Sequence, residues 1–147
     1  MSVSRLSSDT IHASTVAKDG RAVLISGPSG SGKSDLALRL LDRGFSLVSD
    51  DQTHVRREGD RLIASPPPNI AGKLEIRGIG VVEMDHLTDV PVALLVELTS
   101  DIQRMPDDSR ERPILGVTLP LIGIDAMAAS APSKVAVALD RMGLNFQ

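Results

Sequence analysis

The sequence lacks the residues that several common kinds of site require. Its 147 residues include no Cys, no Trp, no Tyr and only two Phe. Without Cys the chain cannot form a disulfide, a thiolate metal site or a cysteine nucleophile. With almost no aromatic side chains, it is poorly suited to bind single-stranded nucleic acid by base stacking. A formal net charge of −3 also argues against a broad DNA-binding face, because such faces carry clustered basic residues.

Long hydrophobic runs are also missing. The most apolar stretch, residues 114–129, is interrupted by glycines, a proline and an aspartate. This pattern predicts strands joined by turns, not a spanning helix of about 18 or more apolar residues. Residues 1–12 have no apolar core of the kind that a secretory signal needs. We therefore expect a soluble, cytoplasmic protein without a membrane or nucleic-acid partner.

The composition suits one domain of ordinary size. Hydrophobic residues make up 41% of the chain and charged residues 24%, which allows a buried core. No internal repeat or long linker divides the sequence, so we expect residues 1–147 to form a single domain. Near the N-terminus the pattern predicts a strand over 21–26, a helix over 33–43 and a strand over 46–49.

The rest of the chain predicts a β-rich arrangement with one more helix. Further strands are expected over 52–58, 61–64, 74–76, 79–84 and 92–98, with Gly59-Asp60 as a hairpin turn and residues 66–68 as an extended connection. The charged segment 101–113 predicts an exposed, mobile loop. Pro132 is expected to begin a helix that runs to about Met142 and ends at Gly143.

Residues 27–34 match the phosphate-binding pattern G-x-x-x-x-G-K-[ST] completely. They are Gly27, Pro28, Ser29, Gly30, Ser31, Gly32, Lys33 and Ser34. Glycines let successive backbone N–H groups point at phosphate oxygens, and the helix that follows adds its dipole. Lys33 is expected to reach the β- and γ-phosphates and Ser34 to ligate Mg²⁺. The pattern predicts nucleotide binding and leaves the phosphoryl acceptor open.

Two acidic residues, Asp50 and Asp51, follow the predicted strand 46–49. In an open α/β sheet this end of a strand lies near the phosphate crevice. Phosphoryl transfer to a hydroxyl needs a carboxylate there to accept the proton, and acidic groups to hold a metal ion. On extended backbone two adjacent side chains point in opposite directions, so we expect different roles for them. The alternative is an ordinary acidic turn.

Residues 74–82 (LEIRGIGVV) form a second unusual string. On a strand, Glu75 and Arg77 would share one face, where they could hold a metal ion and a phosphate, respectively. Gly78 and Gly80 would allow a close approach of the backbone to another group. The alternative is a surface ion pair beside a glycine bulge.

The phosphate loop, residues 43–51 (RGFSLVSDD) and residues 74–80 (LEIRGIG), in this order, resemble the catalytic domain of HPr kinase/phosphorylase. Members of this bacterial family phosphorylate a seryl hydroxyl of HPr, the small phosphocarrier protein of the phosphotransferase system. The resemblance covers most of the chain, from about His12 to Gly143. It implies a single α/β P-loop domain with a mixed, β-rich sheet, ATP and Mg²⁺ as cofactors, and an HPr-like phosphocarrier as partner.

The resemblance also implies roles for individual residues. Lys33, the loop backbone and Arg77 would bind the nucleotide phosphates, and Ser34 with Glu75 would approach Mg²⁺. Asp50 would be the general base of the kinase reaction and the general acid of the reverse, phosphorylase reaction.

Three further residues match the family's pattern at or near the reaction. Asp51 would support Asp50, and His12 falls where the family carries a His before the loop. Arg104 aligns with an Arg of a flexible loop that would touch the transferred phosphate. The short chain resembles α-proteobacterial forms, so the partner would be an HPr of a nitrogen-related phosphorelay. A homo-oligomer, a hexamer in the family, is also implied.

The sequence departs from the family's pattern in several places. Residues 44–47 (GFSL) lack the family's basic His-Arg, and Ala13 stands where a Gly follows the His. We expect neither the separate N-terminal domain nor the final helix of longer members. Two other functions therefore stay open: a P-loop kinase of a small-molecule hydroxyl, and a nucleotide-binding sensor that transfers no phosphate.

Overall fold

The computed structural model describes residues 7–101 and 110–146. Within these residues the chain forms eleven strands, two α-helices and one short 3₁₀-helix. The strands are β1 (Ser8–Ile11), β2 (Ala13–Lys18), β3 (Arg21–Ser26), β4 (Ser46–Ser49), β5 (Thr53–Glu58), β6 (Arg61–Ser65), β7 (Lys73–Ile76), β8 (Gly80–Glu83), β9 (Val90–Leu98), β10 (Glu111–Ile114) and β11 (Val117–Ile124). The helices are α1 (Lys33–Leu41), η1 (Pro68–Ile70) and α2 (Ala131–Met142).

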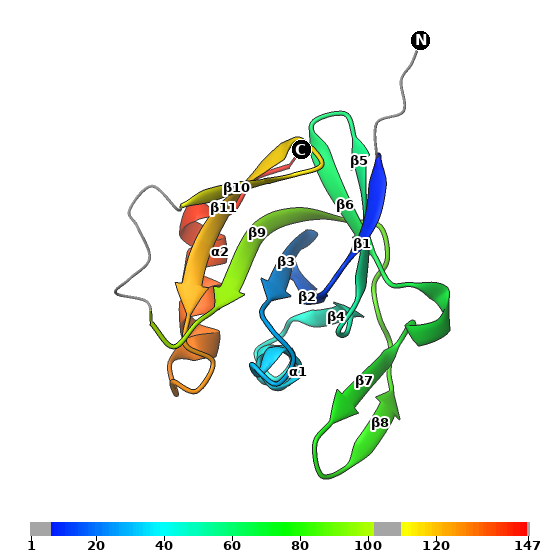
Figure 1. Ribbon diagram of the computed structural model, residues 1–147, viewed down its shortest axis with the longest axis vertical. Coiled ribbons are helices and arrows are strands. Elements are labelled where there is room, and N and C mark those ends of the chain that lie inside the picture. Colours follow the sequence, from blue (N-terminus) through cyan, green and yellow to red (C-terminus); the bar gives the residue numbers. More distant parts are fainter. Residues whose placement is uncertain (1–6, 102–109, 147) are drawn as a thin grey trace.

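Nine of the strands form one mixed sheet (Figure 1). Its main path runs β1-β5-β6-β9-β3-β2-β4, and β11 pairs with β9 and carries β10. Strands β3, β9 and β11 run parallel to one another. The remaining pairs in this sheet are antiparallel. The carboxyl ends of the three parallel strands therefore meet at one edge of the sheet.

Strand β3, which leads into the phosphate loop, is buried on both faces. Val23 and Ile25 belong to one apolar cluster with Leu36 of α1 and Val135 of α2. Leu24 faces a second cluster that contains side chains from β5, β6 and β11. Because alternate residues of a strand face opposite sides of the sheet, a continuous apolar run suits this central position. The phosphate loop therefore follows a strand that is packed into the core on both of its faces.

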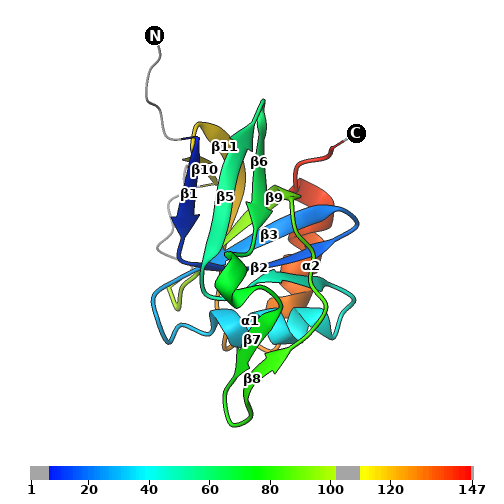
Figure 2. The ribbon, with the colours of Figure 1, turned by 90° about the vertical axis from the view of Figure 1, so that its right-hand side faces the viewer.

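The hairpin of β7 and β8 forms a separate two-stranded sheet. Both views place it at the end of the molecule opposite the β5–β6 hairpin (Figures 1 and 2). Leu74 of β7 is fully buried, whereas Ile79 and Val81 at the far end are 74% and 64% exposed. Strand β7 lies against α1, so the base of the hairpin is next to the phosphate loop.

Most predicted elements agree with the structure. Strands β3 and β4 have the predicted bounds, and α2 ends at Met142 with Gly143 as its C-cap. Helix α1 ends at Leu41, short of the predicted Arg43, because the chain tightens there and the Arg43 N–H donates to Leu40 O at 2.9 Å. Neither helix in the described residues is long and apolar enough to cross a membrane.

The prediction of a loop over 101–113 is wrong for residues 111–113. They lie in β10, which pairs with β11. Among the described strands β10 has no second neighbour, so it lies at an edge of the sheet. Arg112 Nη2 donates to Glu97 Oε1 at 2.8 Å. Charged side chains are common on edge strands, where they remain in solvent. The charge pattern that indicated a loop is equally compatible with such an edge.

Candidate active site at the phosphate-binding loop

The loop between β3 and α1 curls tightly on itself. Gly30 and Gly32 have φ angles of 81° and 101°, which other residues rarely adopt. A Cβ added at Gly27 would lie 2.6 Å from Ser31 Oγ. Of the two glycines that the phosphate-binding pattern fixes, Gly32 is favoured by its backbone angle and Gly27 by close approach; Gly30, at a variable position of the pattern, supplies a second positive φ.

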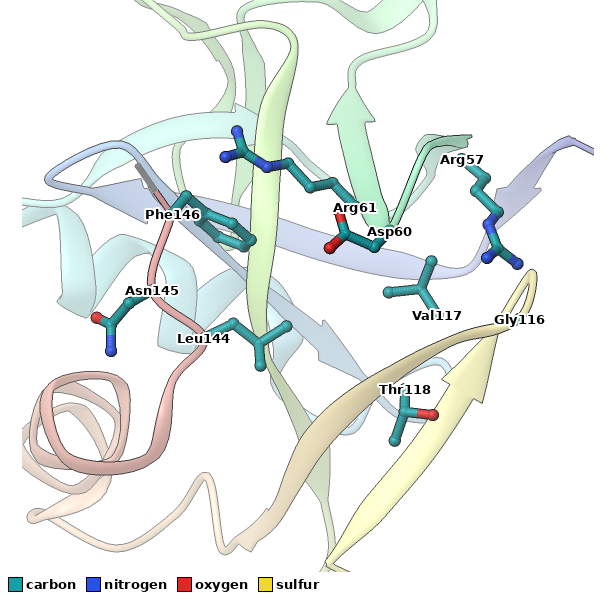
Figure 3. Close-up of a pocket in the computed structure, with 9 residues that line it drawn as sticks. All are labelled: Arg57, Asp60, Arg61, Gly116, Val117, Thr118, Leu144, Asn145 and Phe146. Atoms are coloured by element: carbon teal, nitrogen blue, oxygen red, sulfur yellow. The ribbon is translucent and has the colours of Figure 1, made fainter.

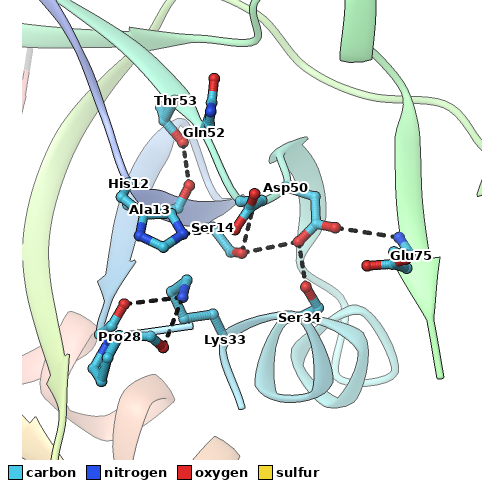
Figure 4. A network of polar contacts seen from close by, with 12 residues as sticks. His12, Ala13, Ser14, Pro28, Lys33, Ser34, Asp50, Gln52, Thr53 and Glu75 are labelled. Carbon is cyan, nitrogen blue, oxygen red and sulfur yellow. Dashed lines mark hydrogen bonds and ion pairs between the residues drawn. The ribbon is translucent and has the colours of Figure 1, made fainter. Parts of the chain in front are cut away.

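The ammonium group of Lys33 lies inside this loop. Its Nζ donates to Gly27 O at 2.9 Å and to Pro28 O at 3.1 Å, and the residue is only 5% exposed (Figure 4). Helix α1 has Gly32 as its N-cap and no side-chain cap, so its first N–H groups are left for an anion. Within the described residues, Ser31 Oγ is buried without a hydrogen-bond partner. A positive charge and donors gathered at one helix terminus suit a phosphate group.

Asp50, at the end of β4, is bonded directly to the phosphate loop. Its Oδ1 accepts a hydrogen bond from Ser34 Oγ at 2.6 Å and another from Ser14 Oγ at 2.9 Å. Its Oδ2 accepts one from the backbone N–H of Glu75 at 3.2 Å (Figure 4). The residue is 7% exposed. A carboxylate is thus held beside the first turn of α1, with an Oδ2 lone pair available for a further donor.

Asp51 takes a different partner and is more open to solvent. Its Oδ1 lies 2.8 Å from Nε2 of His12, and these two side chains are 61% and 45% exposed, respectively. The two aspartates therefore have different partners, and the prediction that they have different roles stays a prediction. Its premise of extended backbone is wrong, because Asp51 has a φ of 65°. The left-handed turn, not the alternation of a strand, separates the two carboxylates.

Ser14 is a site residue to which the sequence did not point. It is fully buried in β2, donates to Asp50 Oδ1 and accepts the Asp51 N–H at 3.0 Å. One hydroxyl therefore positions both aspartates. The available signal was a polar pair, Ser14 and Thr15, inside an otherwise apolar strand; the Thr15 hydroxyl bonds to that of Thr53 at 2.8 Å.

The second sequence string is a hairpin and not a single strand. Strand β7 ends at Ile76, so Arg77 lies in the turn before β8, and the prediction that it shares a strand face with Glu75 is wrong. Gly78 and Gly80 have φ angles of 87° and 110°, and a Cβ at either would meet nothing within 4 Å. Within the described residues these glycines serve the turn, and their predicted close approach to another group stays a prediction. The structure brings Glu75, but not Arg77, into contact with Asp50.

Arg104, the remaining predicted site residue, lies outside the described residues, and its role stays a prediction.

The oxygen donors at this site fit a magnesium ion bound with a nucleotide. Mg²⁺ commonly takes one or two carboxylates together with substrate phosphates and water. Ser34 Oγ is bonded to the Asp50 carboxylate, and the backbone N–H of Glu75 bonds to the same carboxylate, so residue 75 lies beside this pair. In the described part of the chain, no cluster of three or more His, Cys, Asp or Glu residues is suited to a metal ion. A magnesium ion at this site would therefore need oxygen ligands from the nucleotide phosphates in addition to those of the protein.

A cavity of about 370 Å³ lies elsewhere, between the β5–β6 hairpin, the β10–β11 turn and the C-terminal segment (Figure 3). Arg57, which lines it, donates to Gly59 O and Leu115 O and so ties the two hairpins together. Arg61 lies 4.9 Å from the ring centre of Phe146. None of the predicted site residues lines this cavity.

Residues 4–140 match the family described as the HPr serine kinase C-terminal domain. A solved structure, the Hpr(Ser) kinase/phosphatase from Coxiella burnetii, superposes with a TM-score of 0.78 at 30% identity, covering 90% of this chain and 94% of that one.

Curated relatives share a similar level of identity. HPr kinase/phosphorylase of Chlorobium limicola is 37% identical over 92% of this chain, and that of Clostridium botulinum is 30% identical over 93%. The chain spans 44% and 48% of the length of these two relatives, respectively.

Proposed function

Because this chain belongs to the family of the HPr serine kinase C-terminal domain, we propose that it transfers the γ-phosphoryl group of ATP to a seryl hydroxyl of an HPr-like phosphocarrier protein. The membership and the structural match confirm the predicted family and the predicted mixed α/β fold. One observation carries the proposal: the buried carboxylate of Asp50 is bonded at 2.6 Å to Ser34 of the phosphate loop. This bond supports a role for Asp50 as proton acceptor beside the loop that would bind the phosphates.

The loop would bind the β- and γ-phosphates. Its backbone N–H groups and the N-terminus of α1 supply donors that need no rearrangement. Lys33 now donates to two loop carbonyls, and its flexible side chain can exchange these bonds for phosphate oxygens. Because the exchange replaces neutral acceptors with charged ones, it is favourable once the nucleotide arrives.

Ser34 and Glu75 are the residues that would hold Mg²⁺, which leaves the free position of Asp50 Oδ2 for the proton. When bound, this ion would neutralise charge on the phosphate oxygens. The Ser34 hydroxyl can offer a lone pair to a cation while its proton stays with Asp50, because a hydroxyl has one donor and two acceptor positions.

Asp50 would act as the general base. The acceptor hydroxyl attacks the γ-phosphorus as the bond to the ADP leaving oxygen breaks, and the hydroxyl proton passes to Asp50 Oδ2. Three hydrogen bonds hold this carboxylate in place and leave room for that proton. In the reverse direction the protonated Asp50 would return the proton to the seryl oxygen. The His12–Asp51 pair would support the turn that carries Asp50.

The direct test is phosphoryl transfer from γ-labelled ATP, with Mg²⁺, to the HPr-type protein of the same organism. We expect labelled phosphoserine with the wild-type chain and none with Asp50→Asn or Lys33→Ala. ATP binding by Asp50→Asn, measured by calorimetry, should persist and serves as the folding control. Absence of phosphoserine with the wild-type chain would refute the proposal, and ATP consumption with a small alcohol in its place would indicate the small-molecule kinase.

Three expectations remain predictions beside this proposal. They are the homo-oligomer, the single-domain organisation of residues 1–147, and the contact of Arg77 and Arg104 with phosphate. The reverse, phosphorylase activity belongs to the same test, run with phosphorylated acceptor and inorganic phosphate.

A further inference from the structure

The turn after β11, residues 125–130, lies at the same sheet edge as the phosphate loop. Strands β3, β9 and β11 are parallel, and in Figure 1 their arrows point toward the same edge. In open α/β sheets, ligands bind outside the carboxyl ends of such strands. The phosphate loop follows β3, so the turn after β11 lies two strands away along this edge.

This turn is packed against the phosphate loop and tied to α1. A Cβ at Gly32 would lie 3.1 Å from the Cβ of Ala126. The Arg39 guanidinium, on α1, donates to Ala126 O and, at 3.3 Å, to Ala128 O. Its Nε lies 3.1 Å from Asp35 Oδ2. The position of the turn relative to the phosphate loop is therefore set by specific contacts.

Several polar groups of the turn are already used within the protein. The Met127 N–H donates to Asp125 Oδ1 at 2.9 Å, and the Ala128 N–H to Asp125 O at 3.1 Å. The carbonyls of Ala126 and Ala128 accept from Arg39. What this part of the turn offers to a ligand is consequently an apolar surface.

Met127 supplies that surface. It is 89% exposed, more than the other large hydrophobic residues that the described chain exposes. Methionine sulfur is polarisable and makes favourable contacts with aromatic rings. The two Phe residues do not serve here, because Phe45 is buried in the core and Phe146 lines the distant cavity. Met127 directly follows Ala126, the residue that packs against Gly32 of the phosphate loop. An apolar, flexible side chain at this position of the turn is suited to cover the face of a heteroaromatic base.

We propose that the turn of residues 125–130 receives the base of the bound nucleoside triphosphate and that Met127 packs on the face of that base. This inference rests on the proposed function, whose phosphoryl donor is such a nucleotide. Since the contact is with the ring face and not with its hydrogen-bonding edge, ATP and GTP should gain from Met127 about equally.

The test uses the full chain labelled with ¹³C at the methionine methyl groups, and Met127→Leu to assign the Met127 signal. Saturating ATP or GTP should shift that signal, because a ring packs on the methyl group. Inorganic tripolyphosphate, which has the phosphates but no base, should leave it in place. In calorimetry, Met127→Ala should raise the Kd for ATP and GTP about fivefold to tenfold by removing apolar contact, and leave the Kd for tripolyphosphate unchanged.

Two variants control for general effects. Met127→Leu should bind ATP within about twofold of the wild type, because it restores apolar contact. Val137→Ala removes apolar surface at a 58% exposed position on α2, outside the turn and the phosphate loop, and should not change the affinity for ATP.

The outcomes separate this inference from the proposed function. An unmoved Met127 signal under saturating ATP, or an equal loss of tripolyphosphate affinity in Met127→Ala, overturns the inference and leaves kinase activity as it was. A base-dependent shift without phosphoserine formation supports the inference and refutes the proposed function. A wild-type chain that binds no nucleotide overturns both.

Discussion

Replacing Ser14 with Ala tests whether one buried hydroxyl positions the acidic pair. The substitution removes a donor to Asp50 Oδ1 at 2.9 Å and an acceptor of the Asp51 N–H at 3.0 Å. Asp50 keeps its bonds from Ser34 Oγ and Glu75 N–H. The carboxylate therefore stays in the site but loses one of three restraints on its orientation.

The expected magnitude follows from the charge on the acceptor. A hydrogen bond to a charged group contributes about 1.5–3 kcal/mol, and each 1.4 kcal/mol or so is a tenfold change in rate. If the restraint matters mainly when the hydroxyl proton is transferred, kcat should fall about tenfold to a hundredfold. The KM for ATP should change little, because the Ser14 hydroxyl bonds to the two aspartates and not to Lys33 or the backbone of the phosphate loop. The free energy of unfolding should drop by about 1–2 kcal/mol.

Steady-state phosphorylation of the HPr-type acceptor and urea unfolding measure the two effects separately. Thr15→Val is the matched control: it removes a buried hydroxyl from the next residue of β2, whose bond goes to Thr53 and not to an aspartate. It should lower stability by about 1 kcal/mol and leave kcat unchanged. Wild-type kcat in a folded Ser14→Ala variant would refute the reasoning.

Three other substitutions test separate contacts. Gly32→Ala should lower the Tm and weaken ATP binding, because φ is 101° there and the new Cβ would lie 3.1 Å from Ala126 Cβ; unchanged values in thermal unfolding and calorimetry would contradict the loop geometry. Arg39→Lys should destabilise the chain by about 1 kcal/mol in urea unfolding, because Lys cannot reproduce a guanidinium shared between two carbonyls. The Arg56 guanidinium, 2.7 Å from Asp89, lowers the pKa of that carboxyl from its usual 3.8. The stabilising effect of this pairing is therefore complete above pH 4 or so and is lost as the pH falls through the lowered pKa of Asp89. Asp89→Asn should be slightly less stable than wild type at pH 7, and the difference should vanish as the pH falls through that pKa; a constant difference would contradict the pairing.

Local chemistry made much of the site predictable. The pattern of residues 27–34 specifies a backbone curl and a helix start, and both depend on neighbours a few residues apart. Strand β3 is a continuous apolar run, so its type and its bounds followed from composition and from Gly27 after it. Asp50 and Asp51 were found because they follow a strand. Family membership depended on the same short strings in their order.

Contacts between distant residues decided the rest. Ser14 and Asp50 are 36 positions apart, and His12 and Asp51 are 39 apart, so no local pattern relates them. The prediction for Arg77 was wrong because the same short sequence is compatible with a strand and with a hairpin turn, and only the pairing of β7 with β8 decides between them. The turn that carries Ala126 meets Gly32 of the phosphate loop because β11 packs parallel to β9 and β9 to β3. Sequence patterns indicate what the chain does within one turn or one strand. The site, in contrast, is assembled from β2, β4, β7 and the phosphate loop, and these elements meet because they bury a shared core, which is a property of the whole fold.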